Sequence, residues 1–147
     1  MAENIKMPLE GIKVVELATV VAAPTAGRML SAYGAEVIKV ESLTGDDYRV
    51  AGNFECVVCE DYKNPLFTIQ NSGKKLVSID LKQPDGKKAM LRLLDGADVF
   101  LTNVRTGGLQ RLGLDYESLH ERFPRLVYAH FSGFGPKGPV ASNPGFD

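Results

Sequence analysis

The sequence has little cysteine, almost no net charge and no long apolar run. Only two of its 147 residues are cysteine, Cys56 and Cys59, and His120 and His130 lie too far along the chain to complete a zinc site with them. We therefore expect reduced thiols and no metal. The formal net charge of -1 argues against binding to nucleic acid or an anionic membrane by broad electrostatic attraction.

Two hydrophobic signals are also missing. No apolar run reaches the length of a membrane-spanning helix, and the first residues lack the apolar stretch of a signal peptide. We therefore expect a cytoplasmic protein with neither nucleic acid nor a membrane as a partner. Its 44% hydrophobic and 24% charged residues are ordinary for one globular domain with a core.

Short apolar, β-branched runs alternate with amphipathic segments along most of the chain. The runs predict five strands, near residues 12–17, 36–41, 76–81, 99–103 and 126–131. Helices are predicted from Pro24 to about Tyr33, Pro84 to about Asp95, Gly107 to Leu112 and Tyr116 to about Arg122. This alternation is typical of the α/β class with a mainly parallel sheet.

Several boundaries have a specific local signal. Pro24 suits the first position of its helix, where no backbone donor is needed, and Gly34 suits the end of that helix. Asp115 is predicted to cap the last helix. The segment from Ser42 to Gly73 has no clean period and many turn formers, so we expect a long irregular connection there.

Ligands of parallel sheets bind beyond the carboxyl ends of the strands. This rule selects four loops, which begin near residues 18, 42, 103 and 132. The first offers backbone amides at a helix N-terminus, suited to a phosphate or thioester oxygen, although a plain helix start explains the same residues. It lacks the Gly-x-Gly-x-x-Gly fingerprint, which argues against a dehydrogenase domain.

The loop after the fourth predicted strand is more informative. Asn103 to Gly108 and the following Arg111 combine two arginines with two glycines. Guanidinium groups suit phosphate oxygens and glycines let the backbone approach a ligand, but solvated surface arginines would give the same pattern. Elsewhere we expect Lys74, Lys75 and Lys82 to be a solvated basic edge. His130 is expected to be a hydrogen-bonded core histidine.

Taken together, many stretches resemble the family III CoA-transferases of the formyl-CoA transferase type, and they cover practically the whole chain. The matching stretches are Pro8–Leu17, Ala23–Pro24, Gly34–Glu41, Ser78–Leu81, Asp85–Lys87, Ala97–Val99, Asn103 with Arg105, Arg111–Leu114, Pro124–Tyr128, Gly133–Gly135 and Gly145–Asp147.

The resemblance implies a Rossmann-like large domain that holds coenzyme A (CoA), in a homodimer whose two chains are interlocked. It also implies transfer of CoA from an acyl-CoA thioester to a carboxylic acid through an aspartyl-CoA intermediate. The CoA contacts of the family fall on Val21, Ala22, Leu81, Lys82, Asn103, Val104, Arg105, Arg111, Pro144, Gly145, Phe146 and Asp147.

Some residues depart from the formyl-CoA transferase pattern. Val21 replaces a glutamine of those enzymes, and Ser42 replaces an arginine beside the adenine. The stretches at residues 101–106 and 144–147 look closer to the transferases that act on aryl-lactates and 2-hydroxyacyl groups. Related racemases have a histidine base where Phe146 stands, and a phenylalanine cannot abstract a proton, so a racemase is the less favoured alternative.

The family members are more than twice as long as this sequence. Their nucleophilic aspartate lies downstream of the stretch that ends at Asp147. We therefore expect residues 1–147 to be the N-terminal part of the CoA-binding large domain, with no catalytic residue and no activity alone. The alternative from another class is a self-contained, non-catalytic domain that binds CoA or a nucleotide.

Overall fold

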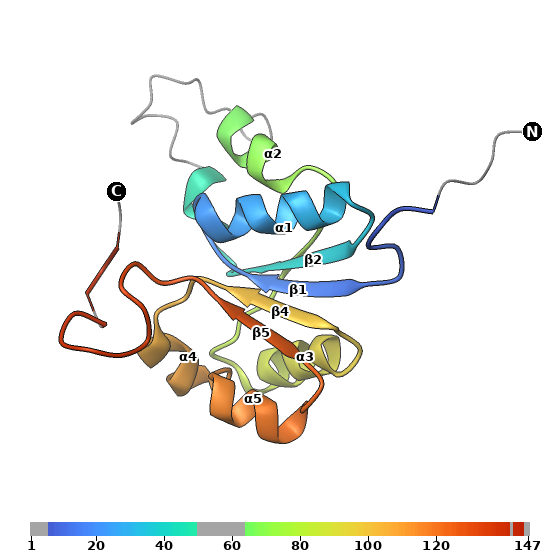
Figure 1. The fold of residues 1–147 in the computed structure, drawn as a ribbon. Coiled ribbons are helices and arrows are strands. Elements are labelled where there is room, and N and C mark those ends of the chain that lie inside the picture. Colours follow the sequence, from blue (N-terminus) through green and yellow to red (C-terminus); the bar gives the residue numbers. More distant parts are fainter. Residues whose placement is uncertain (1–5, 50–63, 142, 146–147) are drawn as a thin grey trace, which may run out of the picture.

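The fold is a parallel sheet covered by helices on both faces. The computed structural model describes residues 6–49, 64–141 and 143–145. In these residues the strands are β1 (Lys13–Leu17), β2 (Glu36–Glu41), β3 (Lys75–Ser78), β4 (Val99–Thr102) and β5 (Val127–His130). All pair in parallel, in the order β3-β2-β1-β4-β5 (Figure 1). This is the strand order of a Rossmann-type sheet, so the predicted α/β class is confirmed.

The helices divide between the two faces of the sheet. They are α1 (Ala22–Ala32), the 3-10 turn η1 (Asp47–Arg49), α2 (Pro65–Asn71), α3 (Pro84–Asp95), α4 (Thr106–Leu112) and α5 (Tyr116–Arg122). Figure 1 shows α1 and α2 on one face and α3, α4 and α5 on the other. No helix of the described residues has both the length and the apolar character that a membrane crossing requires.

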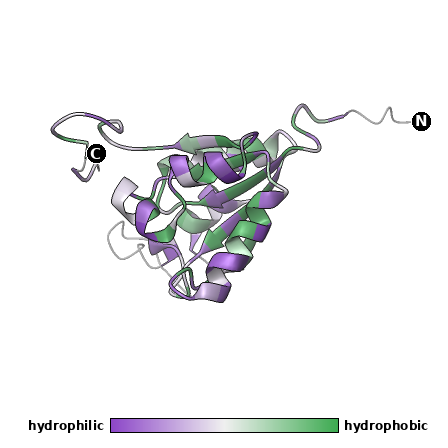
Figure 2. Ribbon diagram, turned by 90° about the horizontal axis from the view of Figure 1, so that it is seen from below, coloured by the Kyte–Doolittle hydropathy of each residue, from purple (hydrophilic) through white to green (hydrophobic). Residues whose placement is uncertain are grey.

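The core has one layer on each face because successive strand residues point to opposite sides. Val14 packs with Ala23 of α1, whereas its neighbour Val15 packs with Met90 of α3, and all of these side chains are fully buried. Strands buried on both faces are apolar at nearly every position, which is the pattern that predicted them. In the helices of Figure 2, hydrophobic and hydrophilic residues alternate, as expected for helices that cover a sheet with one side.

The first helix begins earlier than predicted. Its first residue is Ala22, with Val21 as N-cap, and Thr25 N donates to Val21 O at 2.7 Å. Pro24 is therefore the third helical residue, not the first. Proline is tolerated there because the first-turn N–H groups have no partner inside the helix. Gly34 ends the helix as predicted, with a φ of 102°.

The segment from Ser42 to Gly73 is more regular than predicted, since it contains η1 and α2. The Asn64 side chain accepts from Leu66 N at 2.9 Å, and Pro65 is the first residue of α2. Asparagine as N-cap and proline at the first position are both helix-start signals, but they are also turn signals. Cys56 and Cys59 lie outside the described residues, so the prediction about their thiols stays a prediction.

The remaining boundaries lie close to the predicted ones. Asp115 caps α5, accepting from Ser118 N at 3.1 Å. The strand β3 ends at Ser78, not at Leu81, because the chain turns there: the Asp80 carboxylate accepts from Lys82 N at 3.0 Å. That turn leads directly into α3, which begins at Pro84 as predicted.

Tyr128 on β5 links the sheet to α5 and the turn before it. Its ring packs edge-to-face on Phe100, with centroids 5.4 Å apart, and its hydroxyl donates to Leu114 O at 3.0 Å. Burial, with smaller contributions from the charges of Asp115 and Glu117, raises the pKa of Tyr128 to about 12.

This pKa predicts a loss of stability in alkali. The folded state keeps the Tyr128 proton that the unfolded state releases above pH 10, so stability falls between pH 10 and about 12. In urea unfolding over this range, Tyr128→Phe should lose about 1 kcal/mol less stability than the wild type, a value reduced because the ring is only partly buried. Equal losses in the two proteins would contradict the assignment.

Candidate functional site

The site lies where the strand order of the sheet reverses. β2 pairs with β1 on one side and β4 pairs with β1 on the other. The loops after β1 and β4 therefore lead away from each other. The Asn103 side chain joins these two loops. Its Oδ1 accepts from Thr19 N at 3.0 Å, and its Nδ2 donates to Thr19 O at 2.8 Å. The structure therefore brings the segment of Val21 and Ala22 next to Asn103.

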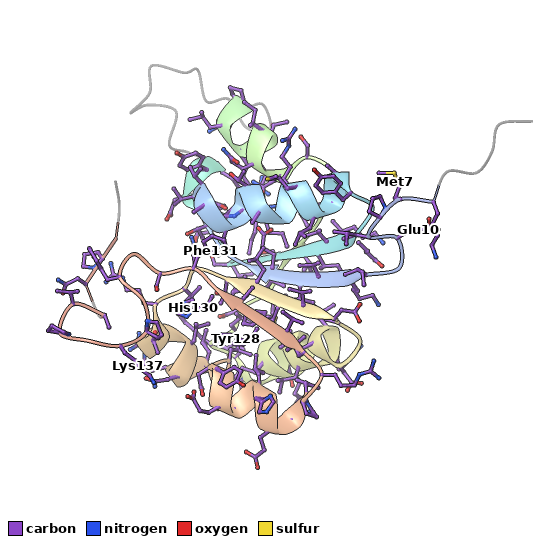
Figure 3. All side chains as sticks on the ribbon, viewed as in Figure 1. Met7, Glu10, Tyr128, His130, Phe131 and Lys137 are labelled. Carbon is purple, nitrogen blue, oxygen red and sulfur yellow. The ribbon has the colours of Figure 1, made fainter. Side chains whose placement is uncertain are left out.

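The loop after β4 is fixed by its neighbours. Val104 N donates to the Thr102 hydroxyl at 3.1 Å, and His130 Nε2 donates to Val104 O at 2.9 Å. His130 is half-buried on β5 and hydrogen-bonded, as expected for a structural histidine (Figure 3). Arg105 follows as the N-cap of α4, with an exposed side chain.

Arg111 lies back along α4 toward the start of the helix. Its Nη1 is 3.7 Å from the position that a Cβ on Gly107 would take, and its Nη2 is 4.0 Å from that on Gly108. The two glycines thus leave room beside the guanidinium group, which is exposed. Arg111 is in the last turn of α4, but its guanidinium group reaches back toward the start of the helix, where Arg105 is the N-cap.

The turn after β3 reaches the same edge. Leu81 packs partly buried against the core cluster of α3 and α4, whereas Lys82 is exposed. Lys87 Nζ of α3 donates to Arg111 O at 3.4 Å, so the helix after this turn contacts α4. Leu81 and Lys82 follow β3 in this turn, and their role as CoA contacts stays a prediction.

The chain after β5 folds back on itself. A Cβ on Gly133 would lie 2.6 Å from the Cα of Gly145, so only glycine allows this approach of the two backbones. Pro144 and Gly145 are thereby held near the carboxyl end of β5. Lys137 lies in the exposed loop between Gly133 and Gly145 (Figure 3). Phe146 and Asp147 lie outside the described residues and stay predictions.

Four buried charged residues lie beneath this edge, and the sequence predicted a role for only one of them, Lys74. They are Glu16 on β1, Lys39 on β2, Asp46 before η1 and Lys74 before β3, all with side chains of 0% exposure. Lys39 Nζ is 3.1 Å from a Glu16 oxygen and 2.8 Å from Asp46 Oδ2. Lys74 Nζ is 2.7 Å from the other Glu16 oxygen.

The expectation that Lys74 belongs to a solvated basic edge was therefore wrong, because its ammonium group neutralises the buried Glu16. Burial raises the pKa of Glu16 and lowers the pKa of Lys74, while the ion pairs oppose both shifts. A sequence signal existed: Glu16 and Lys39 each interrupt an apolar strand that is covered on both faces. Lys75, in contrast, is exposed and pairs with Glu36 on the surface.

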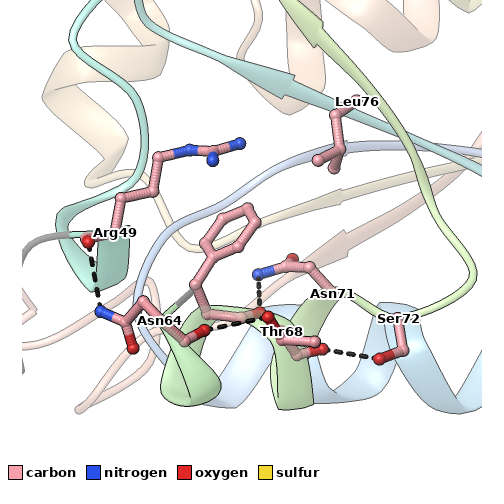
Figure 4. Close-up of a pocket in the computed structure, with 7 residues that line it drawn as sticks. Arg49, Asn64, Thr68, Asn71, Ser72 and Leu76 are labelled. Carbon is pink, nitrogen blue, oxygen red and sulfur yellow. Dashed lines mark hydrogen bonds between the residues drawn. The ribbon is translucent and has the colours of Figure 1, made fainter. Parts of the chain in front are cut away.

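A separate pocket of about 270 Å³ lies between η1, α2 and β3 (Figure 4). Its lining residues are Arg49, Asn64, Phe67, Thr68, Asn71, Ser72 and Leu76. None of them is a predicted CoA contact. Arg49 is engaged there with the Glu41 carboxylate at 2.7 Å and lies over the Phe67 ring, so the pocket wall serves the packing of α2.

The fold and the site define a Rossmann-type α/β protein with a ligand edge at its strand-order reversal. The family model of CoA-transferase family III matches residues 9–147, and the chain belongs to this family.

Among curated relatives, the chain is 43% identical over 141 residues to (R)-2-hydroxy-4-methylpentanoate CoA-transferase of Clostridioides difficile, covering 96% of this chain and 35% of that protein. It is 44% identical over 145 residues to cinnamoyl-CoA:phenyllactate CoA-transferase of Clostridium sporogenes, covering 99% and 35%. The chain thus spans about a third of the length of these relatives.

A solved structure of a CAIB/BAIF family protein from Brucella suis has the same fold. Its TM-score is 0.87 at 41% identity, over 97% of this chain and 38% of that one. The match confirms the parallel sheet with flanking helices.

The neighbours Lys74 and Lys75 allow a matched test of the buried charges. Lys74→Met leaves Glu16 short of one partner in a dry environment, which should lower the free energy of unfolding by about 3 kcal/mol or more. Lys75→Met removes only an exposed pair and should have no measurable effect. Urea unfolding of both variants tests this, and equal stabilities would show that Lys74 is solvated.

Proposed function

We propose that this chain is the N-terminal part of the CoA-binding large domain of an enzyme that transfers CoA from an acyl-CoA thioester to a carboxylic acid. The observation that carries the proposal is the bridge from Asn103 to Thr19. It joins the two loops at the strand-order reversal, the place where Rossmann-type sheets bind nucleotides.

Each predicted contact has a role that fits its chemistry. The exposed guanidinium groups of Arg105 and Arg111 hold the phosphates, because charge-assisted bonds to phosphate are strong. The backbone of Val21 and Ala22 faces the thioester end, at the start of α1. The remaining predicted contacts surround the rest of the nucleotide and the pantetheine arm of CoA. They are Leu81, Lys82, Val104, Pro144, Gly145, Phe146 and Asp147.

The proposed chemistry uses the aspartate nucleophile that the family resemblance places downstream of Asp147. An aspartate carboxylate attacks the thioester carbonyl and displaces the CoA thiolate, which leaves a mixed anhydride. The thiolate then attacks the aspartyl carbonyl and releases the first acid, leaving aspartyl-CoA. The acceptor carboxylate then attacks aspartyl-CoA and displaces the thiolate, which gives a second mixed anhydride. The thiolate attacks the acceptor's carbonyl in this anhydride, which forms the new thioester and frees the aspartate. No metal is needed at any step.

The proposed substrates are 2-hydroxy or aryl-lactate acids with their acyl-CoA donors. The support is the sequence likeness to the two clostridial relatives, whose names give such substrates.

The proposed assembly is an interlocked homodimer in the cytoplasm. The two edge strands are consistent with further covering by protein, because Leu76 on β3 is 45% exposed and Val127 on β5 is 59% exposed.

The first test compares the complete gene product with residues 1–147 alone. The complete protein should exchange CoA between an acyl-CoA donor and a 2-hydroxy acid, detected by mass spectrometry of the thioesters. The 147-residue chain should show no exchange, since the nucleophilic aspartate of the family is expected downstream of Asp147. Sustained exchange by the short chain that is lost in Asp147→Ala would make Asp147 the nucleophile instead.

The second test concerns the phosphates. In the complete protein, Arg105→Ala and Arg111→Ala should each cost roughly 1.5–3 kcal/mol of CoA binding, about one to two powers of ten in Kd. Lys137→Ala is the control, because an ammonium in an exposed loop loses more entropy when it is ordered. Calorimetric titration with CoA measures all three. The placement is wrong if both arginine variants stay within twofold while the lysine variant weakens.

A further inference from the structure

Val20, in the turn between β1 and α1, has an unusual backbone conformation. Its φ of 69° makes it the one non-glycine residue with positive φ in the described part of the chain. The left-handed region is strongly disfavoured for a β-branched side chain. Such a conformation persists only where the surrounding structure holds it, and it is often found at functional sites. Val20 directly precedes Val21, a predicted CoA contact.

The buried charges hold this turn residue by residue. Lys39 Nζ donates to Ala18 O at 2.6 Å. The Asn103 side chain holds both backbone groups of Thr19. Asp46 Oδ1 accepts from Val20 N at 3.1 Å, and the other Asp46 oxygen is 2.8 Å from Lys39 Nζ. Three consecutive turn residues are thus fixed by side chains from three other segments.

The same network reaches the far side of the turn. Lys74 Nζ, which pairs with Glu16, also donates to Pro24 O in the first turn of α1 at 2.8 Å. Glu16 pairs in turn with Lys39. The network therefore contacts the backbone on both sides of Val21 and Ala22, and fixes where the first N–H groups of the 11-residue α1 point.

Stability alone does not account for this arrangement. Burying four charges carries a desolvation cost that pairing only offsets, so buried ion pairs are weak sources of stability. The strained Val20 adds a further cost. What the arrangement does provide is a turn of one fixed shape, and a binding turn that is ordered in advance loses less entropy when a ligand binds.

We propose that Asp46, held by Lys39, is a positioning residue that keeps Val20 in its left-handed conformation and so presents the backbone of Val21 and Ala22 to the thioester end of CoA. This inference rests on the proposed function. Asp46 contacts no substrate itself, since its carboxylate is buried and engaged with Val20, Tyr48 and Lys39.

The main experiment measures the Kd for CoA in the complete protein by calorimetry. Asp46→Ala should raise this Kd at least about tenfold, because Val20 relaxes and the turn loses its shape. Leu94→Ala is the control: Leu94 is buried on α3, against the opposite face of the sheet, so its loss destabilises the fold without touching the turn. The control should stay within about twofold of the wild type.

A double-mutant cycle separates positioning from general destabilisation. Glycine adopts positive φ readily, so a Val20→Gly protein no longer needs Asp46 to hold the turn there. Asp46→Ala should therefore change the Kd less than about threefold when it is added to Val20→Gly. Equal losses in the two backgrounds would overturn the proposal.

A second variant covers the case in which Asp46→Ala does not fold. Val20→Pro keeps all four buried charges but removes the Val20 N–H and fixes φ near -65°. It should raise the Kd for CoA at least about tenfold, and a Kd within twofold of the wild type would contradict the proposal. If the wild-type protein itself binds no CoA, the proposed function fails. If it binds CoA and Asp46→Ala binds equally well, only the positioning role fails.

Discussion

The interaction on which the structure most depends is the pairing of Glu16 with two lysines inside the protein. Glu16 lies on the central strand β1 and has no exposure, so its charge would be very costly without Lys39 and Lys74. These partners come from β2 and from the residue before β3. The pairing therefore constrains the start of α1, the loop after β2 and the entry into β3 together.

The buried charges and the sheet form the rigid part of the molecule, and the loops at the carboxyl ends of the strands are left for ligand binding. The central strands β1, β2 and β4 are covered on both faces, so only their carboxyl ends and the loops there remain for ligands. Asn103 joins two of these loops, and Arg105 and Arg111 lie beside them with exposed charge. The exposed polar groups at this edge thus lie next to a layer of buried charges that neutralise one another.

Most of the fold could be predicted because its signals are local. The five strands are short runs rich in apolar and β-branched residues, which is the local signal that predicted them. The cap at Asp115 is likewise a signal within four residues. The helix α2 was missed because Asn64–Pro65 serves equally as a turn and as a helix start. The start of α1 was misplaced because Pro24 is tolerated anywhere in a first turn.

The sequence by itself determined the strands, their class and which loops follow them, since parallel strands bring their carboxyl ends to one edge. Arg105 and Arg111 could be placed at that edge for this reason alone. Only the tertiary structure decided that Lys74 is buried, since its partner Glu16 is 58 positions away. It also decided the φ of Val20, which depends on Asp46 from another loop. The strength of an ion pair depends on the distance between the two charges in space, and a local sequence pattern does not specify that distance.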